Sequence, residues 1–129
     1  MSEAIRPHEF NEQWGDAFNA GDLPRLMEMY EPGAVIVPGP GAEPIHGHAA
    51  IEAALAGFLG LGGKLRFTPR HWLVAGDLAF SSVAFTMDGG RDPEGRPVEL
   101  TGVTAEILRR QPDGRWKYVV DHPFADART

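Results

Sequence analysis

The sequence predicts an α+β fold, in which three N-terminal helices enclose a pocket against a cone-shaped, curved antiparallel sheet. Apolar residues recur at helical spacing in three segments before residue 60. From residue 64 onward, turn signals separate segments that are typical of consecutive antiparallel strands. Helices that precede strands in this way are typical of the α+β class, where the helices lie across the sheet.

Two helices are expected at the start of the chain. Phe10, Trp14 and Phe18 recur at the spacing of one helical face, and the following NAGD supplies a glycine that suits a helix end. Asp22 then suits an N-cap, with Pro24 tolerated in the first turn of a short second helix. The buried stripe of this second helix is expected to comprise Leu23, Leu26, Met27 and Tyr30.

A strand and a third helix complete the first half. The apolar run AVIV, residues 34–37, predicts a compact strand. The loop PGPGAEPIHG follows, and the segment GLGG ends the helix after it. The apolar face of this third helix comprises Ile51, Leu55, Phe58 and Leu59.

The second half of the chain is predicted to form a four-stranded antiparallel meander. The segment from residue 64 to 88 breaks at AGD into two strands of a hairpin, and GGRDPEGRP forms a longer turn. VELTGVTAEILRR is then expected to be one long strand. QPDG carries Pro, Asp and Gly in their preferred turn positions, and RWKYVVDHPF is the final strand.

Composition limits the classes of function. The 129 residues are expected to form a single domain, residues 1–129, with a core or a core and a pocket. Twelve basic and eighteen acidic residues give a net charge of −6, which is unlike the basic face that a nucleic-acid partner requires. No apolar run approaches the roughly 20 residues that a membrane span needs. The absence of cysteine suits a reducing cytoplasm, and the first ten residues lack an export signal, so a cytoplasmic protein is expected.

Four segments carry a resemblance to a known family. They are AFNAGDLPRLMEMYEPGAVIVPGPG, IHGHAAIEAAL, VAGDLAF and LRRQPDGRWKYVVDHPF. The chain resembles the SnoaL-like, ketosteroid-isomerase-like domains of the nuclear-transport-factor-like superfamily, and more closely its bacterial "ketosteroid isomerase homolog" branch. The resemblance covers residues 7–125 and implies the cone fold. It implies no single activity, because this fold hosts isomerases, cyclases, hydratases, dehydratases and non-catalytic binders.

The resemblance also implies where an isomerase would hold its catalytic groups. The family's catalytic base falls on Pro38, which has no titratable group. The tyrosine that holds the enolate oxygen falls on Trp14, an N–H donor that takes no proton, and the protonated acid falls on Thr104. Classical ketosteroid isomerisation is therefore not expected.

The final strand offers Asp121 and His122 as alternative general bases. Side chains alternate along a strand, so these two point to opposite faces. If the loop at Pro112 is a three-residue turn, Gln111 pairs with Arg115, Thr104 lies beside His122, and His122 faces the cavity. A loop one residue longer would place Asp121 there instead, and late acidic bases occur among cyclases of the superfamily. Under the favoured register the cavity face reads Trp116, Tyr118, Val120 and His122.

Purely structural roles are an equally simple explanation for the presence of Asp121 and His122. His122 would then be a core histidine bonded to a backbone carbonyl, and Asp121 would cap the terminus of the strand or pair with an arginine such as Arg109. Glu106 shares the strand parity of Thr104, which is compatible with a buried acid or with a solvated sheet edge. His46 and His48 lie two apart without a third clustered ligand, so no metal site is predicted. The residues expected to line a ligand pocket are Trp14, Tyr30, Pro38, His71, Thr104 and Tyr118.

Two functional hypotheses follow from the sequence. The first is a small-molecule-binding domain with an apolar pocket that is not a classical isomerase. The alternative is a cofactor-independent isomerase, cyclase or hydrolase-type enzyme with His122 or Asp121 as general base. Both imply a small apolar ligand and no cofactor. An apolar outer sheet face further predicts a homodimer, and under the favoured register it comprises Val103, Ala105, Ile107 and Val119.

Overall fold

The computed structural model describes residues 7–126, and side chains from residue 9 onward. Its elements follow one another as α1 (Pro7–Asn19), α2 (Leu23–Met27), β1 (Tyr30–Ile36), β2 (Ile45–His46), α3 (His48–Leu59), β3 (Lys64–Ala75), β4 (Leu78–Arg91), β5 (Pro97–Val103), β6 (Ala105–Arg110) and β7 (Trp116–His122). The fold is α+β, as the sequence predicts.

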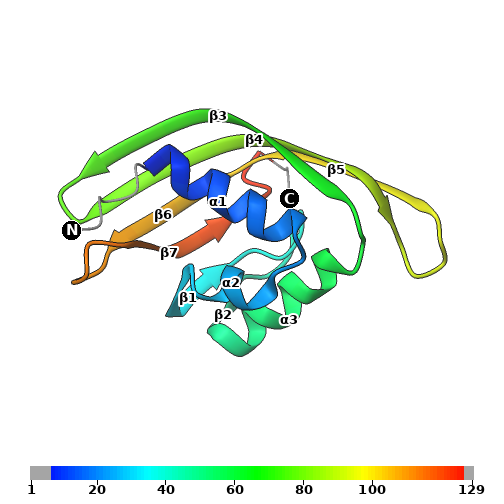
Figure 1. The fold of residues 1–129 in the computed structure, drawn as a ribbon, viewed down its shortest axis with the longest axis horizontal. Helices are drawn as coiled ribbons and strands as arrows, with labels where there is room; N and C mark the ends of the chain where they lie inside the picture. The colour runs from blue at the N-terminus through cyan, green and yellow to red at the C-terminus, as the bar shows by residue number, and fades with distance from the viewer. Residues whose placement is uncertain (1–6, 127–129) are drawn as a thin grey trace.

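The strands form one curved sheet in the order β2-β1-β7-β6-β4-β3, and β5 pairs with β4 beyond the end of β6 (Figure 1). All neighbouring strands are antiparallel except β1 and β7, which run parallel. The sheet is therefore mixed rather than wholly antiparallel. The exception arises because the early strand of the helical half joins the sheet beside the last strand of the chain.

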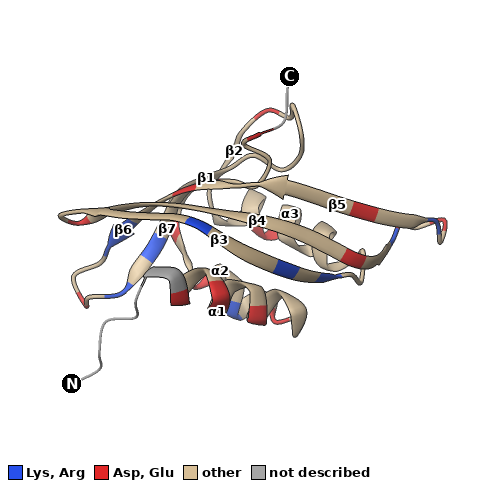
Figure 2. Cartoon of the chain, turned by 90° about the horizontal axis from the view of Figure 1, so that it is seen from above, with Lys and Arg blue, Asp and Glu red and all other residues tan. Residues whose placement is uncertain are grey.

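The helices cover one face of this sheet. Figure 2 shows α1 and α2 on the same side of it, and α1 packs chiefly against β3 while α3 packs against β1. Charged residues of both signs are scattered over several elements in this view. The largest side chains that are fully buried between the two layers are Tyr30, Leu26, Ile36, Ile51, Leu55 and Leu108.

The second helix is shorter than its apolar pattern predicts. Asp22 caps it, because its carboxylate accepts a hydrogen bond from Arg25 N at 3.2 Å. The helix ends at Met27, so Tyr30 is the first residue of β1 and not the last of the helical stripe. Tyr30 is nevertheless completely buried, which explains why an apolar period alone misassigned it.

The expected long strand before the final turn is interrupted at Thr104. Its hydroxyl accepts a hydrogen bond from Val83 N at 3.0 Å, and its carbonyl accepts one from the Ser82 hydroxyl at 2.6 Å. At this point, hydrogen bonds that involve side chains replace some of the backbone hydrogen bonds between the strands. Strand β4 consequently pairs with β5 on one side of the break and with β6 on the other.

The register of β7 corrects the expected orientation of its last residues. Gln111 N donates to Arg115 O at 2.6 Å, so the turn has the predicted length. However, Leu108 pairs with Tyr118 and Ile107 with Val120, which leaves a β-bulge between them. One extra residue reverses the alternation, so the expectation that His122 shares the face of Tyr118 is wrong.

No helix among residues 7–126 is long and apolar enough to cross a membrane.

Candidate functional site

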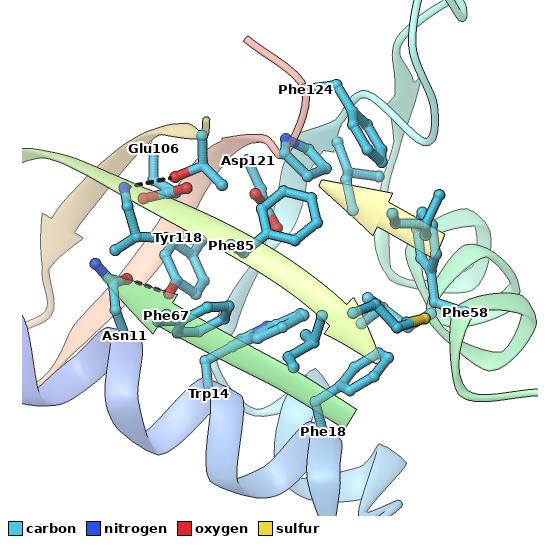
Figure 3. A pocket seen from close by; sticks show the side chains of 18 residues that line it. Asn11, Trp14, Phe18, Phe58, Phe67, Phe85, Glu106, Tyr118, Asp121 and Phe124 are labelled. Carbon is cyan, nitrogen blue, oxygen red and sulfur yellow. Dashed lines mark hydrogen bonds between the residues drawn. The ribbon is translucent and has the colours of Figure 1, made fainter. Parts of the chain in front are cut away.

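The main cavity, with a volume of about 70 Å³, lies between the helices and the sheet (Figure 3). This volume corresponds to a few water molecules. It is lined by Asn11, Trp14, Phe18, Ile36, Leu55, Phe58, Leu65, Phe67, Val83, Phe85, Met87, Leu100, Thr104, Glu106, Tyr118, Asp121, Pro123 and Phe124.

The cavity has a polar end and an apolar end. Figure 3 shows Asn11, Glu106 and Tyr118 together on one side and Phe58 on the other, with Asp121 between them. A lining of this composition suits a mostly apolar molecule that carries a polar group.

The polar end arises from strand register. Ser81 of β4, Glu106 of β6 and Asp121 of β7 are direct partners in one row across the sheet. Trp72 on β3 and Ile36 on β1 continue this row to either side. Because partners in register share a face, the bulge in β7 is what brings Asp121 beside Glu106.

A chain of hydrogen bonds holds Asp121. Trp14 Nε1 donates to the Tyr30 hydroxyl at 3.1 Å, and that hydroxyl donates to Asp121 Oδ2 at 2.6 Å. Tyr30 is the only hydrogen-bond donor to this carboxyl among the described residues. Burial raises the pKa of Asp121 to about 6, and the bond from Tyr30 acts in the opposite direction.

Glu106 is the second acid of the cavity. It is 4% exposed, and its Oε1 accepts a hydrogen bond from the Ser81 hydroxyl at 2.5 Å. Burial and then the charge of Asp121 raise the pKa of Glu106 to about 8, although the hydroxyls of Ser81 and Thr104 lower it. Its carboxyl is thus mostly protonated at neutral pH.

A separate hydrogen bond joins α1 to β7 at the same end of the cavity. The Tyr118 hydroxyl donates to Asn11 Oδ1 at 2.6 Å, and both residues are buried. Burial raises the pKa of Tyr118 and that of Tyr30 well above 10, with the nearby carboxylates adding to the effect. Both phenols are therefore neutral at physiological pH.

The structure brings some of the sequence-predicted residues together. Trp14, Thr104, Tyr118 and Asp121 all line the main cavity. Tyr30 lies behind the lining and contacts it through its hydroxyl.

Three other predicted residues, Pro38, His122 and His71, lie outside the main cavity. Pro38 follows the end of β1 and is half-buried, whereas Ile36 reaches the cavity. The His122 side chain points away from it because of the bulge, and its Nδ1 is buried and has no hydrogen-bond partner among the described residues. A hydrogen bond to a backbone carbonyl, which would be expected of a core histidine, is therefore not observed at Nδ1 of His122.

His71 lies beside a second cavity of about 160 Å³ between α1 and β3. Pro69 pairs with Val83 and His71 with Ser82, so the residue between them forms a bulge in β3. Trp72 also borders this cavity, and its buried Nε1 has no hydrogen-bond partner within the part of the chain that the structure describes. Neither residue lines the main cavity.

The sequence alone predicts no role in the site for Asn11 or Ser81, and it is compatible with either a buried or a solvated Glu106. Alternation from Thr104 does place Glu106 on the cavity face, but burial of an acid is rare enough that a solvated edge is the usual expectation. Ser81 could have been found only by pairing β4 with β6 in the observed register.

Comparison with known proteins identifies the family. The model of the SnoaL-like domain matches residues 11–119. The chain belongs to the SnoaL-like domain family. The fold of the chain is NTF2-like, as a solved structural neighbour shows. No curated protein matches the sequence.

Solved structures share the fold of this SnoaL-like domain. An uncharacterised protein with a cystatin-like fold from Caulobacter vibrioides is 19% identical with a TM-score of 0.76, over 91% of this chain and 84% of the other. A proposed dehydratase of the NTF2-like family from Streptomyces avermitilis is 22% identical with a TM-score of 0.71, over 89% of each chain. An NTF2-like protein of unknown function from Shewanella oneidensis MR-1 is 20% identical with a TM-score of 0.71, over 88% and 92%. At these identities the similarity establishes the fold alone.

The described residues of this SnoaL-like domain contain no group of three or more His, Cys, Asp or Glu side chains that could hold a metal ion. Lys, Arg and His side chains are likewise missing from the described lining of the main cavity. Its polar chemistry consists of two carboxyls and the hydroxyl, amide and indole groups around them.

Proposed function

We propose that this SnoaL-like domain binds a small, mostly apolar molecule through a polar group that contacts Asp121. One observation carries the proposal: the Asp121 carboxyl is 7% exposed, lines an otherwise largely apolar cavity, and has a donor on Oδ2 alone among the described residues. Its Oδ1 has no donor among the described residues and is not a fully buried atom, so a ligand N–H or O–H that enters the cavity can donate to it.

The size of the cavity limits the ligand. A volume of about 70 Å³ suits a ligand of roughly three to eight non-hydrogen atoms unless side chains move. This is much smaller than a steroid, which agrees with the loss of the isomerase groups at Pro38, Trp14 and Thr104.

A thermal-shift screen tests this proposal. Small alcohols and amides, which carry an O–H or N–H donor, and small ketones and lactones, which lack one, are added to the wild type, to Asp121→Asn and to His122→Gln. A ligand at one hundred times its Kd stabilises the native state by about 2.7 kcal/mol. The expected result is a shift that Asp121→Asn abolishes and His122→Gln retains, since His122 lies outside the cavity. An equal loss in both variants, or no shift with any compound, would contradict the proposal.

A second candidate function is a cofactor-independent enzyme in which Asp121 is the general base. It is favoured by the pKa of Asp121, which is raised to about 6 and so suits proton transfer near neutral pH. Asp121 would take a proton from a carbon next to a carbonyl group. Incubation of a bound ketone in D₂O tests this, with NMR following exchange at that carbon. Exchange that Asp121→Asn slows by about 10²-fold or more is expected, and exchange at the uncatalysed rate rules the reaction out.

A further inference from the structure

The two acids of the cavity face one another across neighbouring strands. Glu106 and Asp121 are direct partners of β6 and β7, and both side chains are more than nine-tenths buried. Side chains at such positions begin about 4.5 to 5.5 Å apart at their Cβ atoms. The ion pairs of the described residues involve other carboxylates, so no Lys or Arg offsets the charge of these two.

A single proton on one of the two acids removes the repulsion between Glu106 and Asp121. Two carboxylates side by side in a largely apolar cavity repel one another, and each also loses its hydration. The neighbouring phenols of Tyr30 and Tyr118 are neutral, and the facing side chains of α1 are Asn11 and Trp14, which carry no charge. With nothing cationic nearby, one acid keeps its proton at neutral pH.

The hydrogen bonds favour Asp121 as the ionised acid, because a phenol donor that Trp14 holds in place stabilises the charged form. An indole N–H can only donate, so Trp14 occupies the Tyr30 oxygen as a donor and the phenol proton is directed to Asp121. Asp121 Oδ2 must therefore accept. The Ser81 hydroxyl donates to Oε1 of Glu106, so a proton on this acid lies on Oε2.

We propose that Glu106 is the proton-bearing acid and Asp121 the carboxylate, and that together they select small hydroxycarbonyl compounds. The carbonyl oxygen of the ligand accepts the proton of Glu106, and its hydroxyl donates to Asp121 Oδ1. The ligand part of this inference rests on the proposed function, namely that the main cavity binds a small molecule. The protonation part holds for the empty protein and is tested separately.

The first experiment is an NMR titration of ligand-free protein with ¹³C-labelled side-chain carboxyls. The acid that ionises first does not feel the charge of the second, whereas the second feels the first. Glu106→Gln should therefore change the pKa of Asp121 little, while Asp121→Asn should lower the pKa of Glu106 by one unit or more. The reverse pattern, or two unchanged values, would overturn the assignment.

A third variant keeps the assignment testable if Glu106→Gln or Asp121→Asn fails to fold. Ser81→Ala removes the donor to Glu106 and should raise the pKa of Glu106 without an equal change at Asp121. An equal change at both acids would contradict separate roles. Retained chemical-shift dispersion in each variant confirms that the folded state is being titrated.

The second experiment measures binding of 4-hydroxy-2-butanone against 2-butanone and 1-butanol, which each lack one of its polar groups. The hydroxyketone should bind at least tenfold more tightly than either. Glu106→Gln keeps an N–H donor and should retain binding within a few-fold, whereas Asp121→Asn should lose at least tenfold. Equal affinity for all three compounds overturns the ligand class but leaves the proposed cavity function standing. Absence of binding by any compound, here and in the broader screen, counts against both.

Discussion

The Tyr30 hydroxyl donates to Asp121 Oδ2 at 2.6 Å and so joins the first residue of β1 to β7, 91 positions later in the chain. Tyr30 is completely buried and its oxygen is fixed from behind by Trp14. The N-terminal half of the molecule thus orients an acid on the final strand and opposes the rise that burial causes in its pKa.

Tyr30→Phe is expected to raise the pKa of Asp121 above about 6, because the hydrogen bond favours the charged form. It should also destabilise the fold by roughly 1.5 to 3 kcal/mol, the range for hydrogen bonds to charged groups. Carboxyl NMR titration and urea unfolding measure the two effects. Tyr118→Phe is the matched control, since its hydroxyl donates to Asn11. An equal rise in both variants would argue against a specific role for Tyr30.

The contribution of Glu106 to the stability of the fold should fall as pH rises through the neutral range. Glu106 has a folded-state pKa of about 8 against an ordinary value of 4.5, so the native state binds more protons than the unfolded chain between these values. The stabilising contribution is complete below pH 4.5 and is lost as pH rises through 8. Each pKa unit represents about 1.4 kcal/mol.

Glu106→Gln isolates this contribution from those of other groups. Urea unfolding of the wild type and the variant between pH 5 and 9 gives the difference in their free energies of unfolding. That difference should shift in favour of the variant with increasing pH. A difference independent of pH would mean that Glu106 titrates normally.

The sequence predicted the elements better than the site. Helical spacing and turn residues were sufficient for the three helices, the β3–β4 hairpin and the Gln111–Arg115 turn, since these depend on local interactions. The orientation of Asp121 depends instead on the bulge beside Val120, and neither residue type nor turn length specifies such an insertion. The break at Thr104 is similar, because its hydrogen bonds are made to β4.

Two glycines should respond in opposite ways to substitution by alanine. A Cβ at Gly102 would lie 2.9 Å from the Phe85 ring and 3.1 Å from the Pro123 carbonyl oxygen, so Gly102→Ala should destabilise the fold by about 1 to 3 kcal/mol. Phe85 lines the cavity, and ligand binding should weaken as well. A Cβ at Gly57 in α3 meets no atom within 4 Å, so Gly57→Ala should stabilise by about 0.5 to 1 kcal/mol. Urea unfolding compares the two, and destabilisation of similar size in both would refute the packing argument.

The outer face of the sheet carries a row of exposed apolar side chains. Leu73, Phe80 and Ile107 are direct partners across β3, β4 and β6, and they are 63%, 38% and 41% exposed. They alternate with the residues that form the polar row of the cavity, so they point away from it. The other expected members of this face, Val103, Ala105 and Val119, are half-buried. We predict that this face pairs with a second copy of the chain, because an apolar row of this kind is costly to leave in water.

Lysine substitutions on β3 provide a matched test of the dimer. Leu73→Lys places a charge in the row, and it should convert a dimer to a monomer in sedimentation equilibrium. Val74→Lys introduces the same charge one residue away at a side chain that is 53% exposed but points to the opposite face. It should leave the dimer intact, because its charge stays outside the contact. A wild type that sediments as a monomer at all concentrations would refute the dimer. If both variants dissociated, the interface would lie along the edge strand β3 rather than on the outer face.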